Sequence, residues 1–240
     1  MAGNSDNSAK PLSIALVGAS GLVGRMVMEE AMGREGVRLT AIARREFPLP
    51  HGAKMELVVA DPARWGEVIA DVRPNAMICA LGTTWKQAGR DEDAFRAVDY
   101  DLVMATAEAA KEHGTERFAV VSSVGTNLVS KSFYLRVKAE VERDLAKLKF
   151  KRLDILKPGL LKGARIDDSR AGEGVAKILS PILDPLMMGG LRDMRSIKGA
   201  EVAAGALGLV SHKAGGRFAH NNDSIKRAAR EWYRAGEEEE

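Results

Sequence analysis

Short apolar runs alternate with amphipathic segments along the first two-thirds of the chain. The apolar runs have the composition of buried strands, and the segments between them carry apolar residues at helical spacing. We expect strands at 12–17, 38–43, 55–59, 76–80, 117–121 and 153–156, and helices at 21–32, 62–69, 91–113 and 132–148. Strands of this kind, alternating with helices, are typical of a parallel sheet that is covered on both faces. The pattern predicts an α/β fold with a doubly wound parallel sheet.

The pattern changes after Pro158. Residues 160–195 hold a charged turn and then an apolar stretch that proline and glycine interrupt, which does not suit a strand of the sheet. We expect this segment to be a small C-terminal cap over the carboxyl ends of the strands, acting as a substrate lid, a dimer contact or plain core. Further helices are expected at 199–209 and 223–233. Residues 11–240 then form one domain, after a disordered lead-in at 1–10.

Composition narrows the function classes. The 240 residues are 45% apolar, which suits a globular domain, and 5% aromatic, with a net charge of +3 and no long basic block, so we expect no nucleic-acid partner. The single cysteine, Cys79, lies in an apolar run and suits a reducing compartment, so we expect a cytoplasmic protein. The four histidines lack metal-ligand spacing, and no metal is expected. No apolar run reaches about 18 residues, so we expect no membrane span.

A glycine-rich turn follows the first predicted strand. Gly18, Gly21 and Gly24 stand between that strand and a helical segment. In a dinucleotide-binding turn of this kind the first glycine allows the tight turn, the second lets backbone approach a pyrophosphate, and the third lets the helix pack close to the strand. The free N–H groups of the helix N-terminus would then bind the phosphates. The alternative is a tight turn that binds nothing.

The second predicted strand ends at Arg44 and Arg45, where a dinucleotide fold faces the adenosine ribose. An acidic residue at this point binds a free 2′-hydroxyl, whereas arginine accommodates a 2′-phosphate. The pair therefore favours NADP(H) over NAD(H), the alternative being two solvated surface arginines.

Two further strand exits carry residues suited to a bound coenzyme. Leu81, Gly82 and Thr83 follow the fourth strand, where glycine allows close backbone approach and the threonine hydroxyl can donate a hydrogen bond. Pro158 follows the sixth strand and stiffens its exit. Ordinary turn chemistry explains either stretch equally well.

Ser122 and Ser123 follow the fifth strand, and Tyr134 and Lys138 lie on the next predicted helix. The spacing of four residues places the tyrosine and the lysine on one face, one turn apart. The positive lysine favours the phenolate, so the tyrosine can exchange a proton with a carbonyl or an alcohol, while a serine hydroxyl fixes the substrate oxygen. A surface Tyr–Lys pair is the alternative.

Together these residues resemble the atypical short-chain dehydrogenase/reductases, and within them the Tat-interacting-protein-like branch. The resemblance rests on the runs GASGLVGR, CALGTTWKQAG, VVSSVG, FYLRVKAEVE and LKPGLL. It implies a Rossmann-type sheet, NADPH at the carboxyl edge of the strands, and a Ser/Tyr/Lys catalytic set. It also implies contacts to the coenzyme phosphates from Gly18, Ser20, Gly21, Leu22 and Val23, to the 2′-phosphate from Arg44 and Arg45, and to the ribose and nicotinamide from Leu81, Gly82, Tyr134, Lys138 and Pro158.

The sequence therefore predicts an NADP(H)-dependent oxidoreductase that moves hydride to or from a small carbonyl or alcohol substrate. The alternative from another class of protein is an NADPH-binding regulatory or sensor protein with little turnover. An epimerase or isomerase is a third hypothesis. The asparagine that usually completes the catalytic set has no clear match, since the preceding helix offers Asp99, Tyr100 and Asp101. We expect a monomer or a homodimer.

Overall fold

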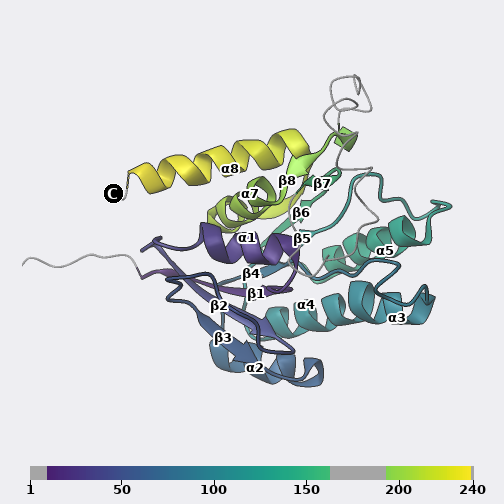
Figure 1. Cartoon of the computed structure of the whole chain (residues 1–240), viewed down its shortest axis with the longest axis horizontal. Helices are drawn as coiled ribbons and strands as arrows, with labels where there is room; N and C mark the ends of the chain where they lie inside the picture. The colour runs from purple at the N-terminus through teal and green to yellow at the C-terminus, as the bar shows by residue number, and fades with distance from the viewer. Residues whose placement is uncertain (1–9, 163–192, 239–240) are drawn as a thin grey trace, which may run out of the picture.

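Parallel strands form the centre of the molecule (Figure 1). Residues 10–162 and 193–238, which the computed structural model describes, contain a sheet of seven strands in the order β3-β2-β1-β4-β5-β6-β9. The strands are β1 Leu12–Val17, β2 Val37–Ala43, β3 Glu56–Val59, β4 Ala76–Cys79, β5 Arg117–Val121, β6 Arg152–Leu156 and β9 Gly216–His220. The six predicted strands and the doubly wound α/β class are confirmed. Strand β9 was not predicted, because its residues are mostly exposed and form no apolar run.

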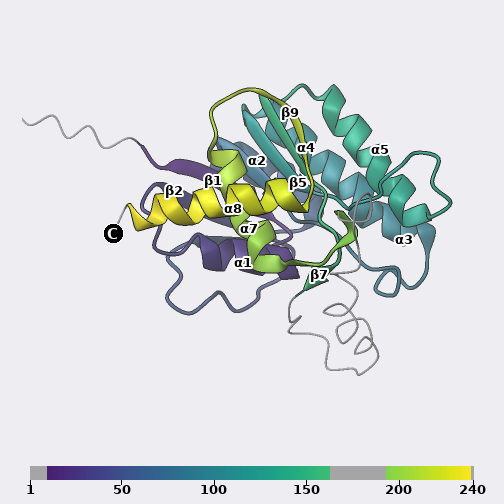
Figure 2. The same ribbon diagram turned by 90° about the horizontal axis from the view of Figure 1, so that it is seen from above.

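Helices cover the sheet in two layers (Figures 1 and 2). One face is packed by α1 (Leu22–Glu30), α7 (Gly199–Ser211) and α8 (Asn222–Glu237). The other face is packed by α2 (Trp65–Val72), α4 (Leu102–Glu112) and α5 (Phe133–Lys147). Two apolar cores result, one on each side of the strands, and Figure 2 looks onto the layer that contains α1 and α8. Because the central strands are buried on both faces, their sequences are nearly continuous apolar runs.

The strand order reverses at β1. From β1 the chain adds β2 and β3 on one side, then returns to place β4 on the other side. The connections leave β1 and β4 in opposite directions, which makes the carboxyl ends of these two strands the topological switch point of the sheet. Open α/β sheets bind their ligands at such a point.

The long helix predicted at 91–113 is divided. It begins as α3 (Glu92–Arg96), passes through a π-helical turn, η2 (Ala97–Asp101), and continues as α4. Its predicted end is confirmed, since Gly114 has a φ of +87° just beyond the helix. A π-turn inserts one residue into the helical register and often occurs at functional sites. Here it turns Asp99 inward, where the side chain is fully buried.

The strands β7 (Leu161–Lys162) and β8 (Ile197–Lys198) pair in parallel and form a small separate sheet. The expected cap at 160–195 lies largely outside the described residues, as does nearly all of the expected lead-in at 1–10. None of the helices in the described ranges has the length and apolar character needed to cross a membrane.

Candidate active site

The turn between β1 and α1 requires glycine at two of its three positions. Gly18 has a φ of +83°, and a Cβ on it would lie 2.4 Å from the Ala80 carbonyl. A Cβ on Gly24 would lie 2.2 Å from the Gly18 oxygen. Gly21 is less restricted, because its Cβ would stand 3.3 Å from the same oxygen. The turn is therefore held against both the β4 exit and the first turn of α1.

The N-terminus of α1 is open. Gly21 is its N-cap, and among the described residues no side chain caps this end of the helix. Ser20 and Gly21 are exposed and Leu22 is half-buried. A helix N-terminus offers unpaired N–H groups and a partial positive charge. This end of α1, beside a turn that a single added methyl group would block, fits the pyrophosphate of a dinucleotide.

Arg44 and Arg45 directly follow β2, which pairs with β1. Both arginines are exposed. They lie at the same edge of the sheet as the Gly18 turn, because the two parallel strands end together there. This position suits contact with the adenosine half of a dinucleotide.

A buried ion pair links α5 to the π-turn. Lys138 Nζ lies 2.9 Å from Asp99 Oδ1, and the two residues are 5% and 0% exposed. Burial lowers the pKa of Lys138, but the Asp99 carboxylate, and after it Tyr134, raises it by more, so the pKa lies above its usual value. The ammonium group therefore stays charged although water is excluded.

The same carboxylate holds the exit of β4. The Thr83 N–H donates to Asp99 Oδ2 at 2.7 Å. A Cβ on Gly82 would stand 3.5 Å from Asp99 Oδ1 and 3.8 Å from Lys138 Nζ, so this loop runs directly over the ion pair. Residues that the sequence placed separately, after β4 and on α5, are thus in contact through Asp99.

Tyr134 lies one helical turn before Lys138 and is 37% exposed. Its ring stands 5.8 Å from that of Phe95, and Phe133 lies 5.7 Å from Phe95 and 5.9 Å from Trp85. Trp85 is 43% exposed. These aromatic rings form an apolar wall next to the tyrosine.

The two serines after β5 differ in their contacts. Ser122 is buried and its hydroxyl donates to Glu142 Oε1. Ser123 is half-buried, and within the described residues its hydroxyl donates a local hydrogen bond of 3.2 Å to the Val124 oxygen. Pro158 lies beside this loop, because its oxygen accepts the Val124 N–H at 3.0 Å.

Sequence reasoning missed two acidic residues. Asp99 was one of three residues that the helix offered at the position of the missing asparagine. Only the π-turn shows that Asp99 is the one whose side chain is buried at the site. Glu142 lies on the same face of α5 as Tyr134 and Lys138, at successive intervals of four residues. That spacing is a signal that the sequence contains, but an acidic residue at helical spacing is usually a solvated one.

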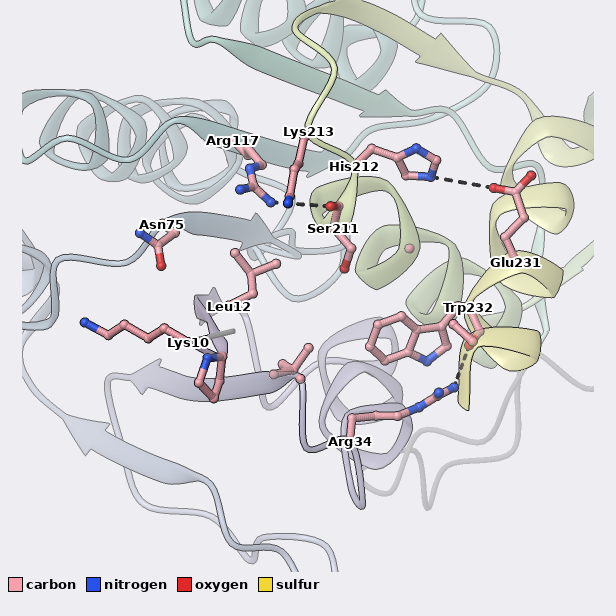
Figure 3. Close-up of a pocket in the computed structure, with 15 residues that line it drawn as sticks. Lys10, Leu12, Arg34, Asn75, Arg117, Ser211, His212, Lys213, Glu231 and Trp232 are labelled. Carbon is pink, nitrogen blue, oxygen red and sulfur yellow. Dashed lines mark hydrogen bonds and ion pairs between the residues drawn. The ribbon is translucent and has the colours of Figure 1, made fainter. Parts of the chain in front are cut away.

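A cavity of about 740 Å³ lies at the amino ends of the strands, opposite the Gly18 turn (Figure 3). Leu12 and Arg117, at the first positions of β1 and β5, line it together with Arg34 and Trp232. The two arginines donate hydrogen bonds to carbonyl oxygens of helices. Arg34 donates to the Trp232 oxygen at 2.7 Å, and Arg117 donates to the Val210 oxygen at 3.0 Å. Dinucleotides bind at the carboxyl ends of parallel strands, so this cavity is not the coenzyme site.

The topology and the glycine turn at the switch point define a Rossmann-type dinucleotide-binding protein. The chain belongs to the NAD(P)H-binding family, whose model matches residues 18–168. The protein FMP52 of Saccharomyces cerevisiae is 36% identical over 162 residues, which cover 66% of this chain and 70% of that protein. The protein HTATIP2 of Rattus norvegicus is 36% identical over 169 residues, 69% of each chain. The predicted likeness to the Tat-interacting-protein-like branch is confirmed.

A solved structure with the same fold is the UDP-N-acetylglucosamine 4-epimerase of Methanobrevibacter ruminantium. Its TM-score is 0.67 at 16% identity, covering 88% of this chain and 77% of that one. The prediction of a cytoplasmic protein is wrong, because similar proteins from Saccharomyces cerevisiae, Emericella nidulans and Candida albicans are named as mitochondrial. A single buried cysteine indicates only a reducing environment and does not separate one such compartment from another.

Proposed function

We propose that this protein is an NADP(H)-dependent oxidoreductase that transfers hydride to or from a small carbonyl or alcohol substrate. The observation that carries the proposal is the buried Lys138–Asp99 pair under the Gly82 loop, with the partly exposed Tyr134 one helical turn away. A lysine held in its charged form beside a tyrosine stabilises the phenolate, which is what proton transfer near neutral pH requires.

The residues then take separate roles. When bound, the nicotinamide supplies or accepts the hydride. Tyr134 transfers the proton to or from the substrate oxygen, and Ser123 donates a hydrogen bond to that oxygen. Lys138 stabilises the phenolate and holds the nicotinamide ribose. Ser122 is the weaker candidate for the serine role, because its hydroxyl is already bonded to Glu142.

The backbone around Gly18 and Gly21 would hold the coenzyme phosphates. The partly exposed rings of Trp85 and Phe133, backed by the fully buried Phe95, would face the substrate. An apolar wall favours an uncharged substrate with an apolar group next to its carbonyl carbon. This character supports a simple aldehyde or ketone over the charged nucleotide sugar that an epimerase would need.

The reaction is tested by following NADPH absorbance with a panel of aldehydes and ketones of increasing apolar length. We expect turnover that improves with apolar length. A wild-type protein that binds NADPH and oxidises it with no member of the panel would contradict the enzymatic proposal.

That contrary outcome would favour the second candidate, an NADPH-binding regulator. One observation supports it: Lys138 is 5% exposed and Asp99 is fully buried, so the ammonium group has little contact with water through which to exchange protons. Tyr134 is 37% exposed and can exchange its proton directly, which is why we place the oxidoreductase first.

Coenzyme preference is tested at the two arginines. Replacing Arg44 and Arg45 together by alanine is expected to weaken NADPH binding by about 100-fold or more, because each hydrogen bond to a charged group contributes about 1.5–3 kcal/mol and about 1.4 kcal/mol is tenfold. NADH binding should change little. Titration calorimetry with both coenzymes measures this. Arg38→Ala is the matched control, since Arg38 is an exposed arginine near the opposite end of the same strand. Equal losses for NADPH and NADH would contradict the assignment.

A further inference from the structure

Three side chains from other parts of the chain contact the Glu142 carboxylate, which has no part in the roles described above. Its Oε1 accepts hydrogen bonds from the hydroxyls of Ser122 at 2.5 Å and Thr126 at 2.8 Å. Its Oε2 lies 3.0 Å from Lys157 Nζ. The Glu142 side chain is only 16% exposed. Both oxygens of one largely buried carboxylate are therefore satisfied by groups distant in the sequence.

These partners come from two loops of the proposed site. Ser122 and Thr126 lie in the loop after β5, and Lys157 directly follows β6. The loops also contact one another, since the Val124 N–H donates to the Pro158 oxygen at 3.0 Å. Glu142 is the group that fastens this pair of loops to α5, the helix that carries Tyr134 and Lys138.

An exposed Glu–Lys pair would not fasten the loops to the helix in this way, because surface ion pairs contribute little to stability and hold no fixed geometry. Glu142 differs in its burial and in its two hydroxyl donors. Hydrogen bonds to a carboxylate are shorter and stronger than neutral ones, so the carboxylate fixes the loop relative to the helix. It also occupies the Ser122 hydroxyl, whereas that of Ser123 makes a long local hydrogen bond of 3.2 Å to the Val124 oxygen.

We propose that Glu142 is a positioning residue of the active site, which sets the placement of the Ser123 hydroxyl and the Pro158 exit relative to Tyr134 and Lys138. The inference rests on the proposed function, since it concerns the nicotinamide half of the same site. The adenosine half is built from the β1–α1 turn and the β2 exit, which Glu142 does not contact. Glu142 therefore acts on one half of the coenzyme only.

This separation supplies the test. NADPH and its adenosine fragment, 2′,5′-ADP, are titrated calorimetrically into wild-type protein and into the Glu142→Gln and Glu142→Ala variants. We expect Glu142→Ala to weaken NADPH binding by about tenfold, because the displaced loops would lose about one hydrogen bond to the coenzyme, and about 1.4 kcal/mol, near the upper value for one such bond, is tenfold. Binding of 2′,5′-ADP should stay within about twofold of wild type. Glu142→Gln should show a smaller loss, because its amide oxygen still accepts the two hydroxyls.

Two further variants complete the design. Glu140→Gln is the matched control: Glu140 lies on the same helix, pairs with Arg96 at 2.8 Å, and should affect neither ligand. Lys157→Met keeps Glu142 and both hydroxyls, and should reproduce the selective loss of NADPH binding in part. It provides a readout if the alanine variant does not fold.

The outcomes are distinct. Equal weakening of NADPH and 2′,5′-ADP would show a general structural role and overturn the inference, as would unchanged binding of both. A wild-type protein that binds neither ligand would instead overturn the proposed function, and the inference with it. Selective loss of NADPH binding supports Glu142 as the positioning residue.

Discussion

Replacing Tyr134 by phenylalanine is expected to lower kcat by about 10²- to 10⁴-fold, the range that general acid–base catalysis by one positioned side chain contributes. This corresponds to about 3–5 kcal/mol of lost transition-state stabilisation. The substitution removes one oxygen atom and leaves the ring against Phe95, 5.8 Å away, so the aromatic wall should persist. Coenzyme affinity, measured by titration calorimetry, should remain within about threefold, because less than 1 kcal/mol of binding is at stake.

Tyr100→Phe provides the control for this measurement. The Tyr100 hydroxyl donates to Asp144 at 2.9 Å and does not contact Lys138 or its partner, so its removal should leave kcat nearly unchanged. Both variants are assayed with whichever carbonyl compound the wild-type protein reduces fastest. Full turnover by Tyr134→Phe would remove Tyr134 from the mechanism.

The sequence was sufficient for those parts of the fold that follow from local pattern. The central strands are buried on both faces, so their apolar runs are continuous and their limits were predicted within a residue or two. Gly18 is required by the close approach of Ala80, which is distant in the sequence. The β1–turn–α1 unit was predictable all the same, because its glycines recur at a spacing of three residues and Gly24 packs against Gly18. Such features depend on neighbours in the sequence.

The missed features depend on contacts between distant segments. Asp99 points inward only because of a π-turn, which no periodicity of the surrounding helix indicates. Strand β9 is held at the sheet edge by pairing with β6, and its exposed residues lack the apolar alternation that marks a strand. The candidate site shows the same division: its residue types were predicted, whereas the contacts among Asp99, Thr83 and Lys138 required the folded chain.

Strand β6 contains a charged cluster that its apolar pattern concealed. Asp154 is fully buried, and Arg152 donates to it twice, at 2.6 and 2.9 Å. His220 Nε2 of β9 lies 2.8 Å from Asp154 Oδ1. The Arg152 guanidinium also stacks 4.6 Å from the ring of Phe218, another β9 residue. The edge strand is thus joined to the sheet through charged groups as well as through backbone hydrogen bonds.

Asp154→Ala is therefore expected to lower the free energy of unfolding by about 3–5 kcal/mol, the usual cost of leaving one member of a buried ion pair without its partner. Arg152 is only 5% exposed and would keep its charge without a carboxylate. Urea unfolding followed by circular dichroism measures the change, which should appear as a lower midpoint at an unchanged slope. A loss below about 1 kcal/mol would contradict the expectation, since that is the value of an exposed pair.

The double variant Arg152→Met, Asp154→Leu separates charge from packing. Replacing both members of a buried pair by apolar residues of similar volume is often neutral or stabilising, because neither charge must then be removed from water. We expect the double variant to recover most of the stability that Asp154→Ala loses, although its His220 no longer has the carboxylate. Recovery would mean that the single variant fails through an unpaired charge. No recovery would mean that the link from Asp154 to His220 holds β9 against the sheet. It would then also hold the start of α8, where the Asn222 side chain accepts the N–H of Gly159 at 3.0 Å beside the proposed site.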